Sequence, residues 1–113
     1  MITIEKLRAY GANVDEAIER CMNNQDFYLM LVNKSLTSNP IPQLEEAINA
    51  GDLEKAFQVA HGLKGVCGNL SLTPLYDAVV EITEPLRNKV EMDYQPLLNK
   101  VKELYQALID LAK

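Results

Sequence analysis

The only histidine in the chain, His61, is followed three residues later by Lys64. On a helix, this spacing places both side chains over the same outer surface. A neutral imidazole nitrogen can attack an acyl phosphate to form a phosphoramidate, which a carboxylate can later discharge. Negative charge spreads over the phosphoryl oxygens during such a transfer, and a nearby ammonium would offset it. Without His61 beside it, Lys64 would be interpreted as an ordinary solvated lysine.

Three of the five glycines lie beside this histidine, at Gly62, Gly65 and Gly68. Each costs about 1 kcal/mol relative to alanine inside a helix, and such departures from local propensity tend to mark functional sites. Gly65 and Gly68 follow His61 by one and two turns on its own face, so we expect a bare shelf that a partner's backbone can approach. Close helix packing is the alternative explanation. Gly62 points elsewhere and receives no functional interpretation.

The helix that must carry these residues is predicted from Leu53 to about Leu70, with Asp52 as its N-cap. At about 100° per residue its apolar positions fall in an arc of about 140°, which predicts a core face. Those positions are Leu53, Ala56, Val59, Ala60, Leu63, Val66, Cys67 and Leu70. His61 lies more than about 90° from the centre of that arc. Phe57, one turn earlier, is either a docking contact or a residue packed at the bundle edge.

Other helices are predicted from capping residues and from prolines. Asn13 with Glu16 starts a short helix toward Met22, and a strongly apolar helix covers residues 26–36. The next runs from about Pro42 to Ala50, followed by Gly51. Another begins with Thr73 as its cap and Pro74 at its first helical position. Asp93 caps the last, in which apolar residues recur every three or four positions. Pro85 predicts a kink or an early end in the penultimate helix.

We therefore predict an all-α protein, an up-and-down four-helix bundle with extra short N-terminal helical segments, forming one domain over residues 1–113. The four longest helices should form the bundle. A content of 48% apolar and 24% charged residues is that of a globular chain. The net charge of -5 argues against nucleic acid as the main partner. A single histidine excludes metal sites that need several imidazoles, and we expect no metal ion.

No apolar run reaches the roughly 20 residues that span a bilayer, and the N-terminus does not resemble a secretory signal. We expect a cytoplasmic monomer that does not bind membranes. Cys21 and Cys67 are expected to be reduced, with Cys67 a small core residue.

Residues 60–65 read Ala-His-Gly-Leu-Lys-Gly, which resembles the A-H-x-L-K-G signature of histidine-containing phosphotransfer (Hpt) domains. Leu70 continues the pattern, and the helix lengths are similar to those of the family over most of the chain. The resemblance implies that His61 is the phospho-acceptor, that Lys64 supports the phosphoryl group and that Gly65 keeps the histidine accessible. Gly68, Phe57 and Arg87 are the further candidate partner-binding or access residues.

The resemblance further implies a phosphorelay intermediate between response-regulator receiver domains, either free-standing or part of a hybrid sensor kinase. The receiver would bring the acidic pocket and its Mg²⁺, so no cofactor is expected here. The sequence contains no GxxxxGK[ST] or GxGxxG loop, and we expect no ATP-dependent kinase activity.

Ser71 departs from the family pattern, and Pro85 complicates the comparison on the next helix. The family usually has glycine seven residues after the lysine, where this chain has Ser71, and we expect altered packing there rather than lost chemistry. Thr83 and Arg87 occupy places on the next helix that often face the histidine, with Pro85 between them. Arg87 is the stronger candidate of the two.

Two other functions are compatible with the sequence. A non-catalytic helical adaptor could bind a signalling partner through the face from Phe57 to Gly68, and would keep its function after His61→Gln. A small enzyme could use His61 as a general base, but it lacks a second catalytic polar group at a suitable spacing.

Overall fold

A computed structural model describes all residues, 1–113, and contains seven α-helices and no strand. The all-α prediction is confirmed. The helices are α1 (Ile4–Tyr10), α2 (Val14–Arg20), α3 (Gln25–Leu36), α4 (Ile41–Asn49), α5 (Leu53–Asn69), α6 (Thr73–Arg87) and α7 (Gln95–Leu111). No helix combines the length and the hydropathy that a membrane crossing requires.

Two of the predicted N-caps are present as expected. The Asn13 side chain accepts a hydrogen bond from the backbone N–H of Glu16, and Asp52 accepts one from that of Lys55 at 3.1 Å. These bonds satisfy N–H groups that have no partner within the helix. The cap at Asp52 sets where α5 begins, and therefore which of its residues face outward.

Two other predicted caps are displaced by one residue. Thr73 is the first residue of α6 rather than its cap, and its hydroxyl donates to the carbonyl of Ser71. Asp93 lies one residue before the cap of α7, although its carboxylate still accepts from the N–H of Gln95 at 3.0 Å. Pro85 lies inside α6, and the helix ends two residues later, at Arg87.

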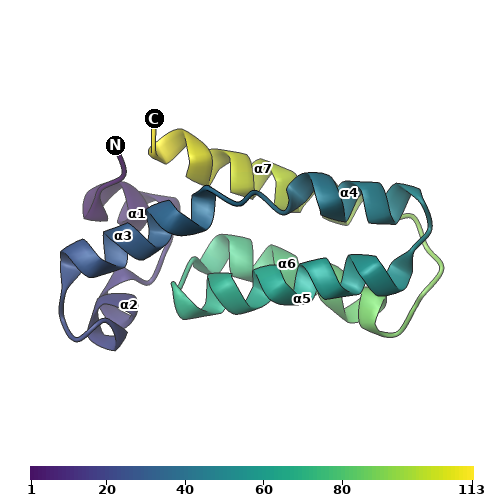
Figure 1. The fold of residues 1–113 in the computed structure, drawn as a ribbon, viewed down its shortest axis with the longest axis horizontal. Helices are drawn as coiled ribbons and strands as arrows, with labels where there is room; N and C mark the ends of the chain where they lie inside the picture. Colours follow the sequence, from purple (N-terminus) through teal and green to yellow (C-terminus); the bar gives the residue numbers. More distant parts are fainter.

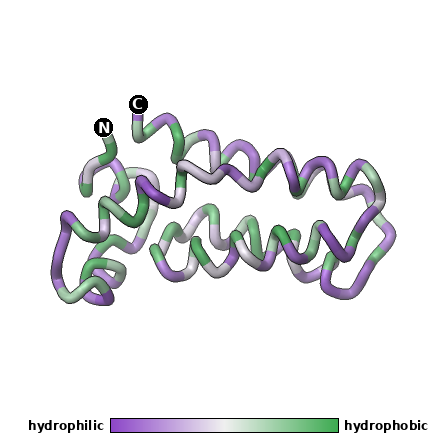
Figure 2. Tube along the Cα trace, viewed as in Figure 1, coloured by the Kyte–Doolittle hydropathy of each residue, from purple (hydrophilic) through white to green (hydrophobic).

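Helices α4, α5, α6 and α7 run up and down as antiparallel neighbours, which confirms the predicted bundle (Figure 1). The ring is closed between α4 and α7 by Lys102, which donates to Glu45 at 2.5 Å, and by Gln95, which donates to Asn49 at 3.2 Å. Along the helices of the bundle, hydrophobic and hydrophilic residues alternate within each turn (Figure 2). This is the pattern of helices that bury one face.

The expectation that the four longest helices form the bundle is wrong for α3. Although α3 is longer than α4, it lies with α1 and α2 at one end of the molecule, and α4 packs along α5 instead (Figure 1). The prolines at positions 40 and 42 interrupt the helix, so a non-helical stretch separates α3 from α4 (Figure 1). As a result, α1–α3 cover the end of the bundle at which α5 terminates.

Candidate functional site

His61 lies on α5 with its side chain exposed, at the edge of a hollow of about 250 Å³. Four predicted site residues line this hollow together with two that were not predicted. The lining residues are His61, Lys64, Gly65, Gly68, Asn69 and Tyr76. The structure therefore brings the histidine, the lysine and the two glycines of its face together.

The outward position of His61 follows from the burial of its neighbours in α5. Ala60 and Leu63, which flank it in sequence, are buried in the core. One member of the predicted core face is misplaced: Val66 is 41% exposed. It borders a second hollow of about 260 Å³, which is also lined by Gly62 and by residues at the end of α3. This second hollow contains no residue of the His61 hollow.

The charge in the His61 hollow is positive in a chain whose net charge is -5. Lys64 is half-buried, and no carboxylate lines the hollow. None of the six ion pairs of the protein involves Lys64, so its ammonium is not neutralised by an acidic partner. A lysine ammonium without an acidic partner, beside an exposed imidazole, favours the binding of an anionic group in this hollow.

The glycines of α5 differ in what surrounds them. A Cβ atom added at Gly62 or Gly65 would meet no atom within 4 Å, so neither glycine is required by packing. A Cβ at Gly68 would lie 3.2 Å from Cε1 of Tyr76, so there the close-packing explanation applies. The open shelf beside His61 is therefore made by Gly65, while Gly68 allows Tyr76 to approach α5.

Phe57 forms a stack that includes both His61 and Arg87. The centroid of its ring lies 5.5 Å from that of the imidazole, at an interplanar angle of 27°. The guanidinium carbon of Arg87, a residue of α6, lies 5.6 Å from the centroid of the Phe57 ring. Phe57 is half-buried against the edge of the core. Arg87 thus reaches the neighbourhood of His61 through Phe57, and it also pairs with Glu84 at 3.8 Å.

Thr83, the weaker candidate on α6, does not face His61. It is fully buried, and its hydroxyl donates to the carbonyl of Val79 one turn earlier. This local bond satisfies a hydroxyl that would otherwise be unpaired in the core. The helical position of Thr83 relative to Leu86 and Ile82, which are also buried, places it on the core face of α6.

Asn69 and Tyr76 were not predicted as site residues. Asn69 follows His61 by two turns, so the spacing on α5 could have indicated it. Tyr76 comes from α6, and only the three-residue connection between the helices brings it beside Gly68. Such a short connection between antiparallel helices was the available signal.

The departure at Ser71 has a conformational basis. Ser71 has a φ of 53°, the left-handed region in which glycine is favoured. Its N–H donates to the carbonyl of Gly68, and the N–H of Leu72 donates to that of Cys67 at 3.0 Å. These are the two bonds of a Schellman turn, which ends α5. Ser71 lies outside the His61 hollow, and its hydroxyl accepts a hydrogen bond from Arg20.

Comparison with known proteins gives one match. The family model for the Hpt domain matches residues 35–111, which include every predicted site residue. Comparisons with curated proteins and with solved structures gave no match. Because the family model covers more than half of the chain, the protein belongs to the Hpt domain family, whose helical bundles carry phosphoryl groups on histidine in two-component signalling.

Proposed function

We propose that His61 accepts a phosphoryl group from the phospho-aspartate of one receiver domain and passes it to another, with Lys64 supporting the phosphoryl oxygens. The observation that carries this proposal is the His61 hollow, where an exposed imidazole and an unpaired ammonium lie together and no carboxylate is present. The proposal makes the protein a phosphocarrier without a kinase activity of its own. It acts as a monomer in the cytoplasm.

The transfer can be written as a balanced exchange. An unprotonated ring nitrogen of His61 attacks the phosphorus of the aspartyl phosphate, so a P–N bond forms as the P–O bond to the carboxylate breaks. The carboxylate leaves with the electron pair, and the other ring nitrogen keeps its proton. The second receiver's aspartate reverses these steps. In both directions the acidic pocket and Mg²⁺ belong to the receiver.

Lys64 acts on the charge of the transferring group. The loose transition state of phosphoryl transfer keeps its negative charge on the three equatorial oxygens. An ammonium that is not paired with a carboxylate can turn toward these oxygens at little cost. Lys64 therefore lowers the barrier in both directions, which suits a carrier that must accept and donate.

The partner approaches over Gly65, where the surface is open, and meets the edges formed by Gly68, Phe57 and Arg87. A bare helical surface lets the aspartyl phosphate come within bonding distance of the imidazole without a side chain in between. We propose that response-regulator receiver domains, free or within a hybrid sensor kinase, are these partners.

A two-stage transfer experiment tests this function. Receiver domains from the same organism are phosphorylated with labelled phosphate, mixed with the protein, and removed before a second, unlabelled receiver is added. The relay predicts that label passes to the wild type and on to the second receiver, and that His61→Gln blocks the first stage. Receivers that bind the protein equally well with and without His61, and transfer no label, would contradict the relay and support an adaptor.

A further inference from the structure

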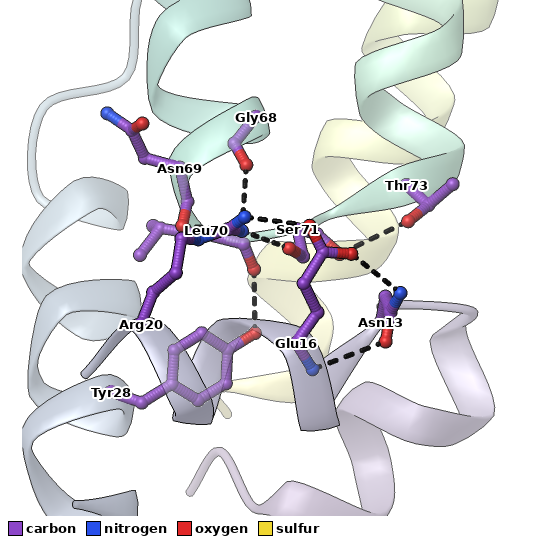
Figure 3. Close-up of polar contacts among 9 residues, drawn as sticks. All are labelled: Asn13, Glu16, Arg20, Tyr28, Gly68, Asn69, Leu70, Ser71 and Thr73. Carbon is purple, nitrogen blue, oxygen red and sulfur yellow. Dashed lines mark hydrogen bonds and ion pairs between the residues drawn. The ribbon is translucent and has the colours of Figure 1, made fainter. Parts of the chain in front are cut away.

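The backbone at the end of α5 is also held from outside the bundle, in addition to the bonds of its own Schellman turn. Four consecutive carbonyls, those of residues 68–71, accept hydrogen bonds from the segment spanning residues 13–28 (Figure 3). Tyr28 donates its hydroxyl to the carbonyl of Leu70 at 2.9 Å, and the backbone N–H of Asn13 donates to that of Ser71 at 2.9 Å. This segment precedes the residues that match the Hpt family model.

Arg20 makes the largest share of these contacts. Its Nη2 atom donates to the carbonyls of Gly68 and Asn69, each at 3.1 Å, and also to the hydroxyl of Ser71 (Figure 3). Its other terminal nitrogen, Nη1, donates to Glu16 at 2.8 Å. A cation at the C-terminus of a helix is also favoured by the helix dipole.

The guanidinium also supports a backbone conformation that serine does not favour. Ser71 is buried and has a φ of 53°, where a residue with a Cβ atom is less stable than glycine. A serine hydroxyl can accept a hydrogen bond that glycine could not, and Arg20 donates it. Arg20 therefore stabilises the left-handed backbone conformation of Ser71.

We propose that Arg20 is a positioning residue for the phosphotransfer site, which holds the Gly68–Asn69 side of the His61 hollow in the form that the receiver binds. Gly68 and Asn69 line the hollow, and Arg20 binds both of their carbonyls. This inference rests on the proposed function. Because Arg20 touches neither His61 nor Lys64, it acts on docking of the receiver and leaves the transfer step unchanged.

Rapid-quench transfer from a phosphorylated receiver separates docking from chemistry. For Arg20→Gln we expect the half-saturating receiver concentration to rise at least fivefold, with the saturating rate constant within twofold of wild type. Arg8→Gln is the matched control, because Arg8 on α1 also pairs with a carboxylate, that of Asp15 at 2.6 Å, and is similarly exposed, but makes no hydrogen bond with residues 68–71. Equal half-saturating concentrations for the two variants, or a loss confined to the saturating rate, would overturn the proposal.

Rescue at Ser71 tests whether Arg20 acts through the left-handed turn. Glycine adopts this conformation without support, so Ser71→Gly in the Arg20→Gln background should return the half-saturating concentration to within twofold of wild type. A double variant no better than Arg20→Gln would overturn this route. Thermal unfolding identifies any variant that fails to fold, in which case Arg20→Lys, which keeps the charge but loses the fork of donors, replaces Arg20→Gln and is expected to raise the same constant.

Amide spectra keep the inference separate from the proposed function. In the unphosphorylated protein, Arg20→Gln should shift or broaden the amide resonances of residues 68–72 more than Arg8→Gln does. If the wild type accepts no phosphoryl group from any receiver, the proposed function fails while these spectra still report on the turn. Unchanged resonances at residues 68–72 would overturn the positioning role.

Discussion

The Phe57 ring is stacked on the imidazole of His61, with the ring centroids 5.5 Å apart and the planes inclined by 27°. The two residues are one helical turn apart on α5, so the same backbone sets both positions. The stack restricts the rotation of a ring that is otherwise open to solvent.

Replacing Phe57 by leucine should slow phosphoryl transfer without unfolding the protein. An aromatic stack contributes about 0.5–1.5 kcal/mol beyond its buried area, so we expect a rate lower by roughly 2- to 10-fold. The measurement is the saturating transfer rate from a phosphorylated receiver. Phe27→Leu is the control, because Phe27 is the only other phenylalanine and lies exposed on α3. An equal effect of both substitutions would contradict a specific role of the stack.

Lys64→Gln should reduce the transfer rate more than it reduces receiver binding. The loss of one charge-assisted hydrogen bond to the phosphoryl group corresponds to about 1.5 kcal/mol, or on the order of a tenfold slower rate. Lys55→Gln provides the comparison, since it removes an exposed lysine from the same helix at a distance from the hollow. If the two variants transfer at the same rate, Lys64 is a solvated lysine.

Alanine at Gly65 should stabilise the fold and impair function. Each of Gly62→Ala and Gly65→Ala should raise the free energy of unfolding by about 1 kcal/mol, because alanine is the better helix former and neither Cβ meets another atom within 4 Å. Only Gly65→Ala should weaken transfer, since Gly62 does not line the His61 hollow. Urea unfolding and transfer assays on both variants test this, and equal transfer by the two would refute the open-shelf role.

Gly68→Ala should not share this gain in stability. Its Cβ would lie 3.2 Å from the Tyr76 ring, so the ring must move by a few tenths of an ångström. We expect the free energy of unfolding to fall below that of Gly65→Ala when both are measured by urea unfolding. An equal gain at the two positions would show that Tyr76 adjusts without cost.

The Cys67 thiol should not react in the folded protein. Burial raises the pKa of Cys67 from 9.0 to about 12, so at pH 8 only about one thiol in ten thousand is ionised. The contribution of this group to stability is complete below about pH 9 and is lost as the pH rises toward 12. Iodoacetamide at pH 8 should therefore modify the half-buried Cys21 first, and both cysteines in urea. Comparable rates at Cys21 and Cys67 in the folded protein would contradict this burial.

The sequence correctly predicts which residues of α5 point outward and which point into the core, apart from Val66, because this depends on local helix geometry. Asp52 caps the helix, and from there a rotation of 100° per residue turns His61 outward and Leu63 inward. The error at Val66 has a tertiary cause, since its side chain borders a hollow between α5 and the chain around Pro40.

Residues contributed by other helices were not predictable in the same way. Tyr76 enters the hollow through the register between α5 and α6, which is set by the left-handed backbone at Ser71. Arg20 reaches that turn from 51 positions earlier in the chain. Nothing in the periodicity of either helix encodes these contacts.

The most direct test of the central claim is the chemical nature and position of the transferred phosphoryl group. Wild type and His61→Gln are exposed to the same labelled phospho-receiver, and the retained label is followed in acid and in alkali. We predict a label on wild type that is lost in acid and kept in alkali, is found by mass spectrometry in the peptide containing His61, and is absent from the variant. Label of equal amount and stability on His61→Gln would contradict phosphotransfer through His61.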